Sequence, residues 1–184
     1  MRREFVLVLG LVAIAAHARD LEIGSAVPDF MVKPIESPAF SFAEAARTHA
    51  AVVVLFLSTV CPYSKYYADH LQELEAHFGK KGVLFIGVNS NRTETAEEVV
   101  AYARRRDHAF PMVKDAGSAI ADVFGARVTP EAFLVDAEGR LRYKGRIRSK
   151  IGSTDLKDAL EAMLARRPIR TPVAKAFGCA IQRE

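Results

Sequence analysis

The residues of this chain best suited to covalent chemistry are its two cysteines, Cys61 and Cys179. Cys61 lies in the segment Ser58-Thr59-Val60-Cys61-Pro62, and Cys179 lies near the end of the sequence, directly after Gly178. A thiolate is a nucleophile toward disulfides, and two thiols of one chain can also join to each other. The two cysteines therefore indicate either a redox pair or one structural disulfide.

The position of Cys61 favours a reactive thiol. It follows an apolar, β-branched run over residues 51–57 and precedes a helical pattern over residues 62–78. Pro62 is tolerated in the first turn of a helix because the N–H that it lacks would be unpaired there. At a helix N-terminus, free N–H groups and the positive end of the helix dipole stabilise an anion. The pattern thus predicts a lowered pKa for Cys61 and a nucleophilic role.

The elements around Cys61 predict an α/β fold in a single domain. Two buried parallel strands joined by a helix, followed by an antiparallel hairpin, give a mixed central sheet with helices on both faces. The expected order is a short helix (40–48), a strand (51–57), a helix (62–78) stopped by Gly79, a strand (83–88), a helix opened by a Thr95–Glu98 capping box, an extended piece (110–113), a short helix (118–124), a hairpin (132–136 and 140–146) and a closing helix from Ser153.

The two ends of the sequence are expected to differ from this domain. Arg2-Arg3, the apolar run 5–16 and Ala16-His17-Ala18 have the layout of a cleavable signal peptide, and the run is short of the ~20 residues that span a bilayer. We expect cleavage after Ala18, export to the periplasm or the medium, a domain over 19–165 and a tail over 166–184. The prolines and Gly178 of the tail are expected to preclude a regular element.

Composition narrows the possible partners. Of 184 residues, 50% are hydrophobic, and the net charge of +4 gives no reason to expect nucleic acid as a partner. The histidines at positions 49, 70, 77 and 108 lack metal-ligand spacing. We therefore expect no metal, no cofactor and no stable membrane insertion.

The chain resembles the thioredoxin-like redoxins over about residues 24–165. The resemblance rests on the apolar strand, the segment Ser58-Thr59-Val60-Cys61-Pro62-Tyr63-Ser64, the segment Val128-Thr129-Pro130 and the strand 133–136. That group includes the periplasmic thiol–disulfide oxidoreductases and the alkyl hydroperoxide reductase or peroxiredoxin proteins. It implies a thioredoxin fold and thiols or disulfides, of proteins or small molecules, as partners. It also implies that Pro130 is a cis-proline that faces Cys61, and that the backbone of Thr129 pairs with a bound peptide. A trans-proline turn is the alternative.

Two positions depart from the thioredoxin pattern. Ser64 stands where thioredoxins have a second cysteine, so it can donate a hydrogen bond to the Cys61 thiolate but cannot close a disulfide. Leu55 stands where thioredoxins keep a buried acid. Cys179 is the only other thiol, and Gly178 would allow its backbone a close approach. Cys179 is thus expected to resolve the intermediate at Cys61, with a static Cys61–Cys179 disulfide as the alternative.

Two other functions remain open. Peroxiredoxins have a hydroxyl three residues before the cysteine, which Ser58 supplies, but Val54 replaces their proline and Pro130 stands at their arginine position. A thiol peroxidase is therefore the second choice. A non-catalytic binding module with a structural disulfide is the third, since basic residues alternate along 140–150. We expect this basic strand to be a charged edge that blocks pairing, and less readily a surface for an acidic partner.

Overall fold

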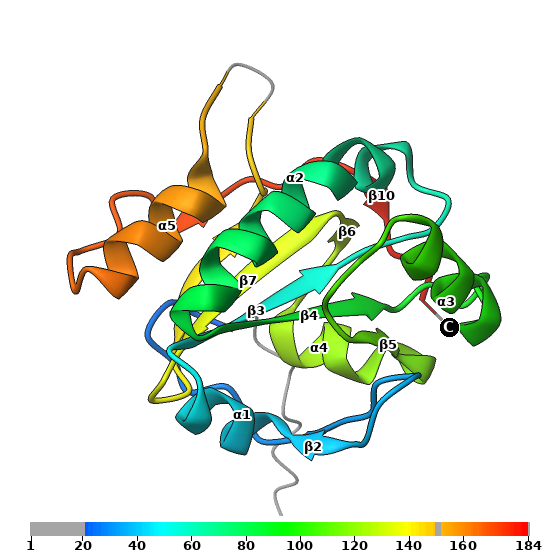
Figure 1. Cartoon of the computed structure of the whole chain (residues 1–184), viewed down its shortest axis with the longest axis horizontal. Coiled ribbons are helices and arrows are strands. Elements are labelled where there is room, and N and C mark those ends of the chain that lie inside the picture. Colours follow the sequence, from blue (N-terminus) through cyan, green and yellow to red (C-terminus); the bar gives the residue numbers. More distant parts are fainter. Residues whose placement is uncertain (1–20, 150–151, 184) are drawn as a thin grey trace, which may run out of the picture.

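The computed structural model describes residues 21–149 and 152–183, so the expected signal peptide over 1–18 lies outside the described residues. Figure 1 shows how the helices and strands of the described chain are arranged. Their bounds are β1 Met31–Val32, β2 Phe40–Ser41, α1 Phe42–Thr48, β3 Ala51–Phe56, α2 Pro62–Phe78, β4 Val83–Asn89, α3 Ala96–Arg105, β5 Met112–Lys114, α4 Ala119–Phe124, β6 Val128–Thr129, β7 Glu131–Asp136, β8 Leu141–Gly145, α5 Asp155–Leu164, β9 Val173–Ala174 and β10 Cys179–Ala180.

The central sheet has six strands in the order β5-β4-β3-β7-β8-β9. Strands β3, β4 and β5 run parallel, β7 lies antiparallel to β3, and β8 lies antiparallel to β7. Every residue of β3 is buried. A central strand is covered on both faces, which is why this segment reads as a continuous apolar run.

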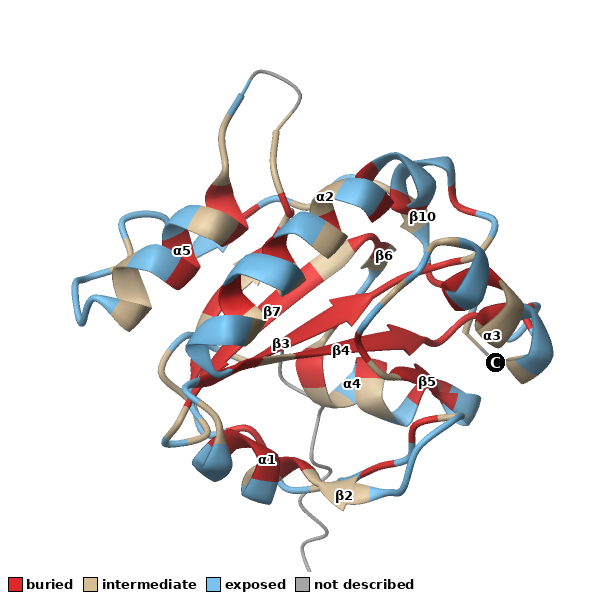
Figure 2. Ribbon diagram, viewed as in Figure 1, coloured by how far each residue is buried: buried red, intermediate tan, exposed pale blue. Residues whose placement is uncertain are grey.

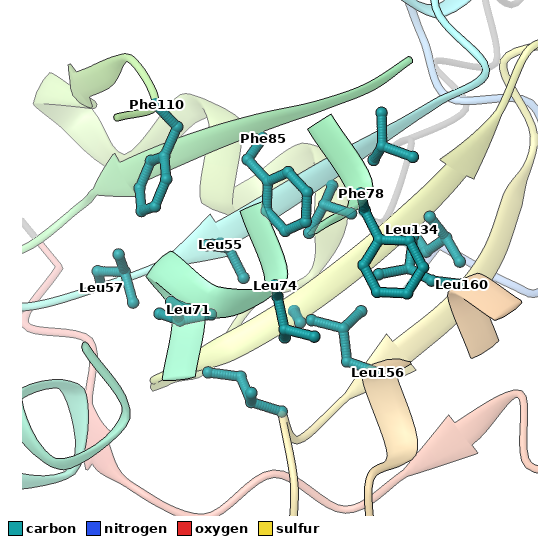
Figure 3. Packing of buried hydrophobic residues seen from close by; sticks show 14 of the residues in the cluster. Leu55, Leu57, Leu71, Leu74, Phe78, Phe85, Phe110, Leu134, Leu156 and Leu160 are labelled. Atoms are coloured by element: carbon teal, nitrogen blue, oxygen red, sulfur yellow. The ribbon is translucent and has the colours of Figure 1, made fainter. Parts of the chain in front are cut away.

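Helices cover both faces of the sheet. Leu55 of β3 packs in a cluster with residues of α2, α3 and α5, whereas Val54 packs in a second cluster with residues of α1 and α4. Figure 2 shows the buried strands between helices whose outer faces are exposed, and Figure 3 shows the first cluster, with Leu71 and Leu74 of α2 over the sheet. The thioredoxin fold, with its mixed sheet and helices on both faces, is confirmed.

Helix α2 holds Cys61 at its start and ends at Phe78, followed by Gly79 at its C-cap. At Gly79 the backbone is still helical, and the chain continues as one 3-10 turn to Lys81. Gly82, with φ of +83°, ends that turn in the left-handed region that favours glycine. The expectation that α2 ends at Phe78, with Gly79 after it, is confirmed, and the 3-10 turn is a separate short element.

The interpretation of the basic strand as a charged edge is wrong. β8 lies inside the sheet, because β9 pairs with it in parallel through Lys144↔Val173 and Gly145↔Ala174. Its basic side chains have partners within the chain: Arg142 pairs with Asp136, and the Lys144 ammonium donates to the Leu21 carbonyl. The alternating basic residues make one face of β8 polar, although β9 covers the edge of that strand.

The tail contains two short strands, contrary to the expectation that its prolines and glycine preclude regular elements. Pro168 and Pro172 precede β9, and Gly178 precedes β10, so none of them lies within a strand. β9 joins the central sheet and β10 pairs with β6. Over the described ranges, no helix combines the length and the apolar character needed to cross a membrane.

Candidate active site

Cys61 lies at the N-cap position of α2 and is only 1% exposed. Its Sγ atom lies 3.1 Å from the backbone carbonyl oxygen of Thr129, to which the protonated thiol donates. The Thr129–Pro130 peptide bond is cis. The buried end of β3 and the segment before β7 thus bring Cys61, Thr129 and Pro130 together.

The tail covers this cysteine. β10 pairs antiparallel with β6, with Cys179 opposite Thr129 and Ala180 opposite Val128. The Cys179 thiol hydrogen-bonds to the sulfur of Cys61, and both cysteines are free thiols. The Thr129 hydroxyl donates to the Cys179 carbonyl at 3.5 Å. The backbone edge at Thr129 is therefore occupied by the chain's own C-terminal segment.

Gly178 allows the tail to come this close. A Cβ atom at this position would lie 1.9 Å from the carbonyl oxygen of Thr129 and 3.1 Å from the nitrogen of Pro130. Both contacts are to backbone, so a flexible side chain cannot move aside to relieve them. Any side chain at position 178 would separate the tail from β6.

The two thiols have opposite pKa shifts. Burial by itself would raise the pKa of Cys61, but hydrogen bonds outweigh burial and hold the pKa below its ordinary value. The largest of these comes from the Cys179 thiol, and the others include the backbone N–H groups of Ser64 and Cys179. Donation to Cys61 raises the pKa of Cys179 to about 11, with burial adding to it. At neutral pH, Cys61 is the better thiolate and Cys179 the proton donor beside it.

Ser58 and Ser64 shape the loop before the helix. The Ser58 hydroxyl oxygen accepts from the backbone N–H of Cys61 at 3.1 Å, and the hydroxyl donates to a Glu94 oxygen at 2.7 Å. The Ser64 hydroxyl accepts from the backbone N–H of Ser58 at 3.2 Å. Ser64 reaches the Cys61 sulfur with its backbone N–H, whereas the sequence suggested its hydroxyl.

Glu94 is a site residue that sequence reasoning missed. Its carboxylate is buried and accepts from the Ser58 hydroxyl, the Thr59 N–H at 2.6 Å, and the amides of Asn89 and Asn91 at 2.9 and 2.7 Å. Burial raises its pKa, but these hydrogen bonds outweigh burial, so the pKa is lowered and the carboxylate is charged. Glu94 therefore fixes the loop that carries Cys61, although Leu55 leaves the thioredoxin acid position apolar.

The six residues singled out from the sequence are gathered at one place. They come from the end of β3, the start of α2, the β6–β7 junction and β10, and they are Cys61, Cys179, Pro130, Thr129, Ser64 and Ser58. In the described part of the chain, no group of three or more His, Cys, Asp or Glu could hold a metal ion. The arrangement provides a stabilised thiolate with a second thiol within reach, which suits thiol–disulfide exchange.

The hydrogen bonds at Cys61 predict its titration. We expect the rate of Cys61 alkylation, followed by mass spectrometry of its peptide against pH, to show a midpoint below the ~8.5 of a free thiol. Cys179→Ala should move that midpoint upward, because it removes the largest stabilising hydrogen bond. A midpoint at or above ~8.5 in the unmodified chain would contradict the assignment of Cys61 as a thiolate.

Comparisons with known proteins agree with this reading. The AhpC/TSA family model matches residues 23–144. Thiol-disulfide oxidoreductase ResA of Bacillus cereus is 26% identical over 129 residues, 70% of this chain and 72% of that protein. Thiol:disulfide interchange protein DsbE of Vibrio cholerae is 28% identical over 158 residues, 78% and 76% of the two chains. The crystal structure of a hypothetical protein from Sinorhizobium meliloti matches with a TM-score of 0.81 at 28% identity, covering 90% of this chain and 97% of that one.

Proposed function

The chain belongs to the AhpC/TSA family and is a thiol–disulfide oxidoreductase, and we propose that Cys61 is its nucleophile and Cys179 its resolving thiol. One observation carries the assignment of roles. The segment that holds Cys179 is paired to Thr129, and its thiol is hydrogen-bonded to the Cys61 sulfur. Ser64 cannot supply the second thiol, so the tail supplies it.

The proposed exchange has two steps. The Cys61 thiolate attacks one sulfur of a substrate disulfide, a mixed disulfide forms, and the other sulfur leaves as a thiolate. Cys61 is then no longer an anion, so the interaction that raised the pKa of Cys179 is gone. Cys179 loses its proton and attacks the Cys61 sulfur, which releases the second substrate thiolate. The substrate gains two electrons and the protein ends with a Cys61–Cys179 disulfide. An external dithiol reduces it, and the reverse sequence oxidises a dithiol substrate.

The partners and location follow from the same proposal. Thiols or disulfides of proteins or small molecules are the substrates, which the names of the relatives support. We also propose export, on the basis of the basic and apolar N-terminal segment and cleavage after Ala18. Mass spectrometry of the protein recovered from its native host would give a mature N-terminus at Arg19. An intact N-terminus at Met1 would contradict export by cleavage.

Turnover with disulfide and with peroxide tests the proposed function. We expect kcat/KM for a small disulfide to exceed that for hydrogen peroxide by about a hundredfold or more, since loss of one transition-state donor costs about that much. Val54 and Pro130 stand where peroxiredoxins have a proline and an arginine. The Ser58 hydroxyl proton is committed to Glu94, so it is not directed at a bound peroxide.

The control is Cys61→Ser, which should abolish both reactions. Rapid peroxide consumption without disulfide exchange would reverse the ranking and favour a thiol peroxidase. Activity toward a partner that survives loss of both cysteines would instead favour the binding module.

A further inference from the structure

A cavity of about 320 Å³ borders the candidate active site through Pro130 and Phe177, although neither cysteine lines it. Its lining comes from α2, the cis-proline, the segment after β8 and the tail, and includes Tyr63, Tyr67, Pro130, Ile147, Arg148 and Phe177. Aromatic and aliphatic surface dominates this set. Tyr63 is 37% exposed and lies at this cavity, while Tyr67 is buried. A cavity of this size suits a small molecule with an aromatic or branched aliphatic body.

The cavity touches the reactive centre through two of its walls. Pro130 directly follows Thr129, whose carbonyl oxygen is 3.1 Å from the Cys61 sulfur. Phe177, which is 60% exposed, lies two residues before Cys179 on the tail. A molecule in the cavity therefore lies against Pro130, which follows Thr129, and against the segment that carries the second thiol.

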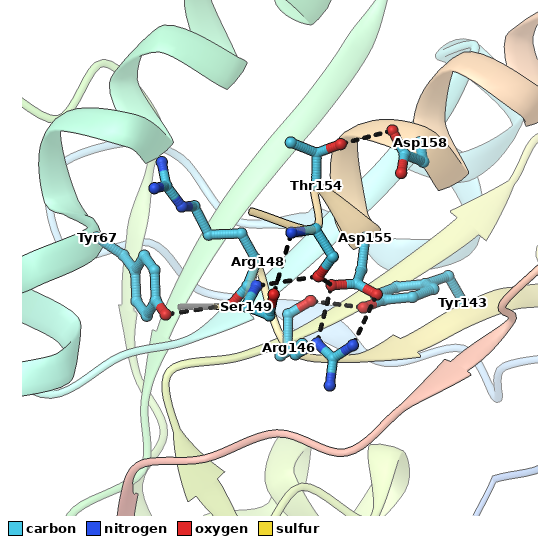
Figure 4. Close-up of polar contacts among 9 residues, drawn as sticks. Tyr67, Tyr143, Arg146, Arg148, Ser149, Thr154, Asp155 and Asp158 are labelled. Carbon is cyan, nitrogen blue, oxygen red and sulfur yellow. Dashed lines mark hydrogen bonds and ion pairs between the residues drawn. The ribbon is translucent and has the colours of Figure 1, made fainter. Parts of the chain in front are cut away.

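The Arg148 guanidinium at the cavity has no partner among the residues that the structure describes. Arg146 is held by Asp155 through two hydrogen bonds of 2.8 and 3.1 Å, so its charge is neutralised (Figure 4). Arg148 accepts a bond from the Tyr67 hydroxyl at its carbonyl, 3.1 Å away. Its guanidinium makes no hydrogen bond or ion pair with any residue that the structure describes. A planar guanidinium binds a carboxylate through paired N–H groups.

Extended peptides are a poorer fit to this site. The edge of Thr129, which would pair with a peptide, already holds β10. A protein substrate would have to displace the tail before it could pair there, whereas the cavity is open with the tail in place. This favours small disulfides over protein disulfides.

We propose that the cavity binds a small disulfide that carries an aromatic or bulky aliphatic group and a carboxylate, with the apolar part against Tyr63, Pro130 and Phe177 and the carboxylate on Arg148. The proposal rests on the function proposed above and names its substrate class. The bound disulfide reaches the Cys61 sulfur when the tail shifts away from Cys61, which is 1% exposed beneath it. The reduced Cys61–Cys179 pair then supplies the two electrons for a single turnover. One S–S bond breaks in the substrate, and one forms in the protein.

Binding is tested apart from the redox reaction. The reduced chain is titrated with 2-naphthoate, an aromatic carboxylate with no sulfur, and followed by NMR. We expect saturable shifts at residues around Tyr63, Arg148 and Phe177. Arg148→Gln should weaken binding about tenfold, as expected for loss of a hydrogen-bonded charge. Arg47→Gln, which removes an exposed arginine on α1, should leave it unchanged. Absence of saturable binding, or equal effects of the two variants, overturns the proposal.

Selectivity is then tested with two aromatic disulfides in single turnover. We expect the rate ratio of 5,5′-dithiobis(2-nitrobenzoate), which has carboxylates, to 2,2′-dithiodipyridine, which has none, to fall about tenfold in Arg148→Gln and to stay constant in Arg47→Gln. Using the ratio cancels any change in Cys61 reactivity. If both disulfides react but the ratio is unmoved, this inference fails and the proposed function stands. If naphthoate binds at the cavity but neither disulfide is reduced, the proposed function fails and the binding site stands.

Discussion

Replacing Cys179 with serine is expected to lower the steady-state rate of disulfide exchange by about a hundredfold or more, while the first attack by Cys61 continues. The Cys179 thiol is held on the Cys61 sulfur by the β6–β10 pair, and a well-oriented internal group acts with a very high effective concentration. Without it, a mixed disulfide at Cys61 can be resolved only by an external thiol at ordinary concentrations. Mass spectrometry of the variant after one substrate equivalent should find the substrate fragment trapped on Cys61.

Two further variants separate the roles of Cys179. Cys179→Ala should trap the same intermediate but form it more slowly near neutral pH, because Cys61 also loses its strongest hydrogen-bond donor. Cys61→Ser should trap nothing. If Cys179→Ser turns over at the original rate, or if the two sulfurs are never found joined, Cys61 acts alone as a monothiol.

A static disulfide between the same residues is distinguished by its reduction potential. A structural bond in an exported protein typically lies below about −300 mV, whereas a working bond is reduced more readily. Equilibrating the protein with thiol buffers of defined potential and counting the free thiols would decide between them. A reduction potential below about −300 mV would favour a static structural disulfide over a resolving role for Cys179.

Patterns within single segments of the sequence were enough to predict much of the fold and several of the residues at the candidate active site. The β-branched run 51–57 and the proline at position 62 each act within their own segment, and β3 and α2 formed where these patterns predicted. The cis bond before Pro130 was expected through the resemblance to redoxins, and the structure has it. Gly178 was expected to allow a close approach, and its neighbour is the Thr129 backbone.

The remaining features depend on contacts between distant segments. Glu94 precedes a capping box and looks like one more acid at a helix start, yet its carboxylate binds Ser58, 36 residues earlier. The polar pair Asn89 and Asn91 at the end of a buried strand was the available hint, since buried amides need partners. The two-residue strands of the tail are too short for any periodic pattern to reveal.

Gly178→Val is expected to release the tail from the site without unfolding the domain. Its Cβ would meet the Thr129 carbonyl oxygen at 1.9 Å, and that backbone cannot move without disturbing the contact to the Cys61 sulfur. With β10 detached, Cys61 should become exposed and Cys179 should become a thiol on a flexible segment, at a local concentration of only about millimolar. Alkylation of Cys61 should then accelerate at least about tenfold, and formation of the Cys61–Cys179 disulfide should slow by a larger factor.

The measurement must separate exposure from ionisation, because the detached tail also takes away the hydrogen bond that lowers the pKa of Cys61. Alkylation rates are therefore compared on the high-pH plateau of each variant, and circular dichroism checks that the fold is retained. Ala180→Val is the matched control: it adds a branched side chain to the same short strand at an exposed position, so both rates should stay unchanged. If Gly178→Val also keeps slow alkylation and fast disulfide formation, then close packing on Thr129 is not what holds Cys179 at the site. The tail would have to be anchored further on, where Gln182 binds Asn91 and Arg92.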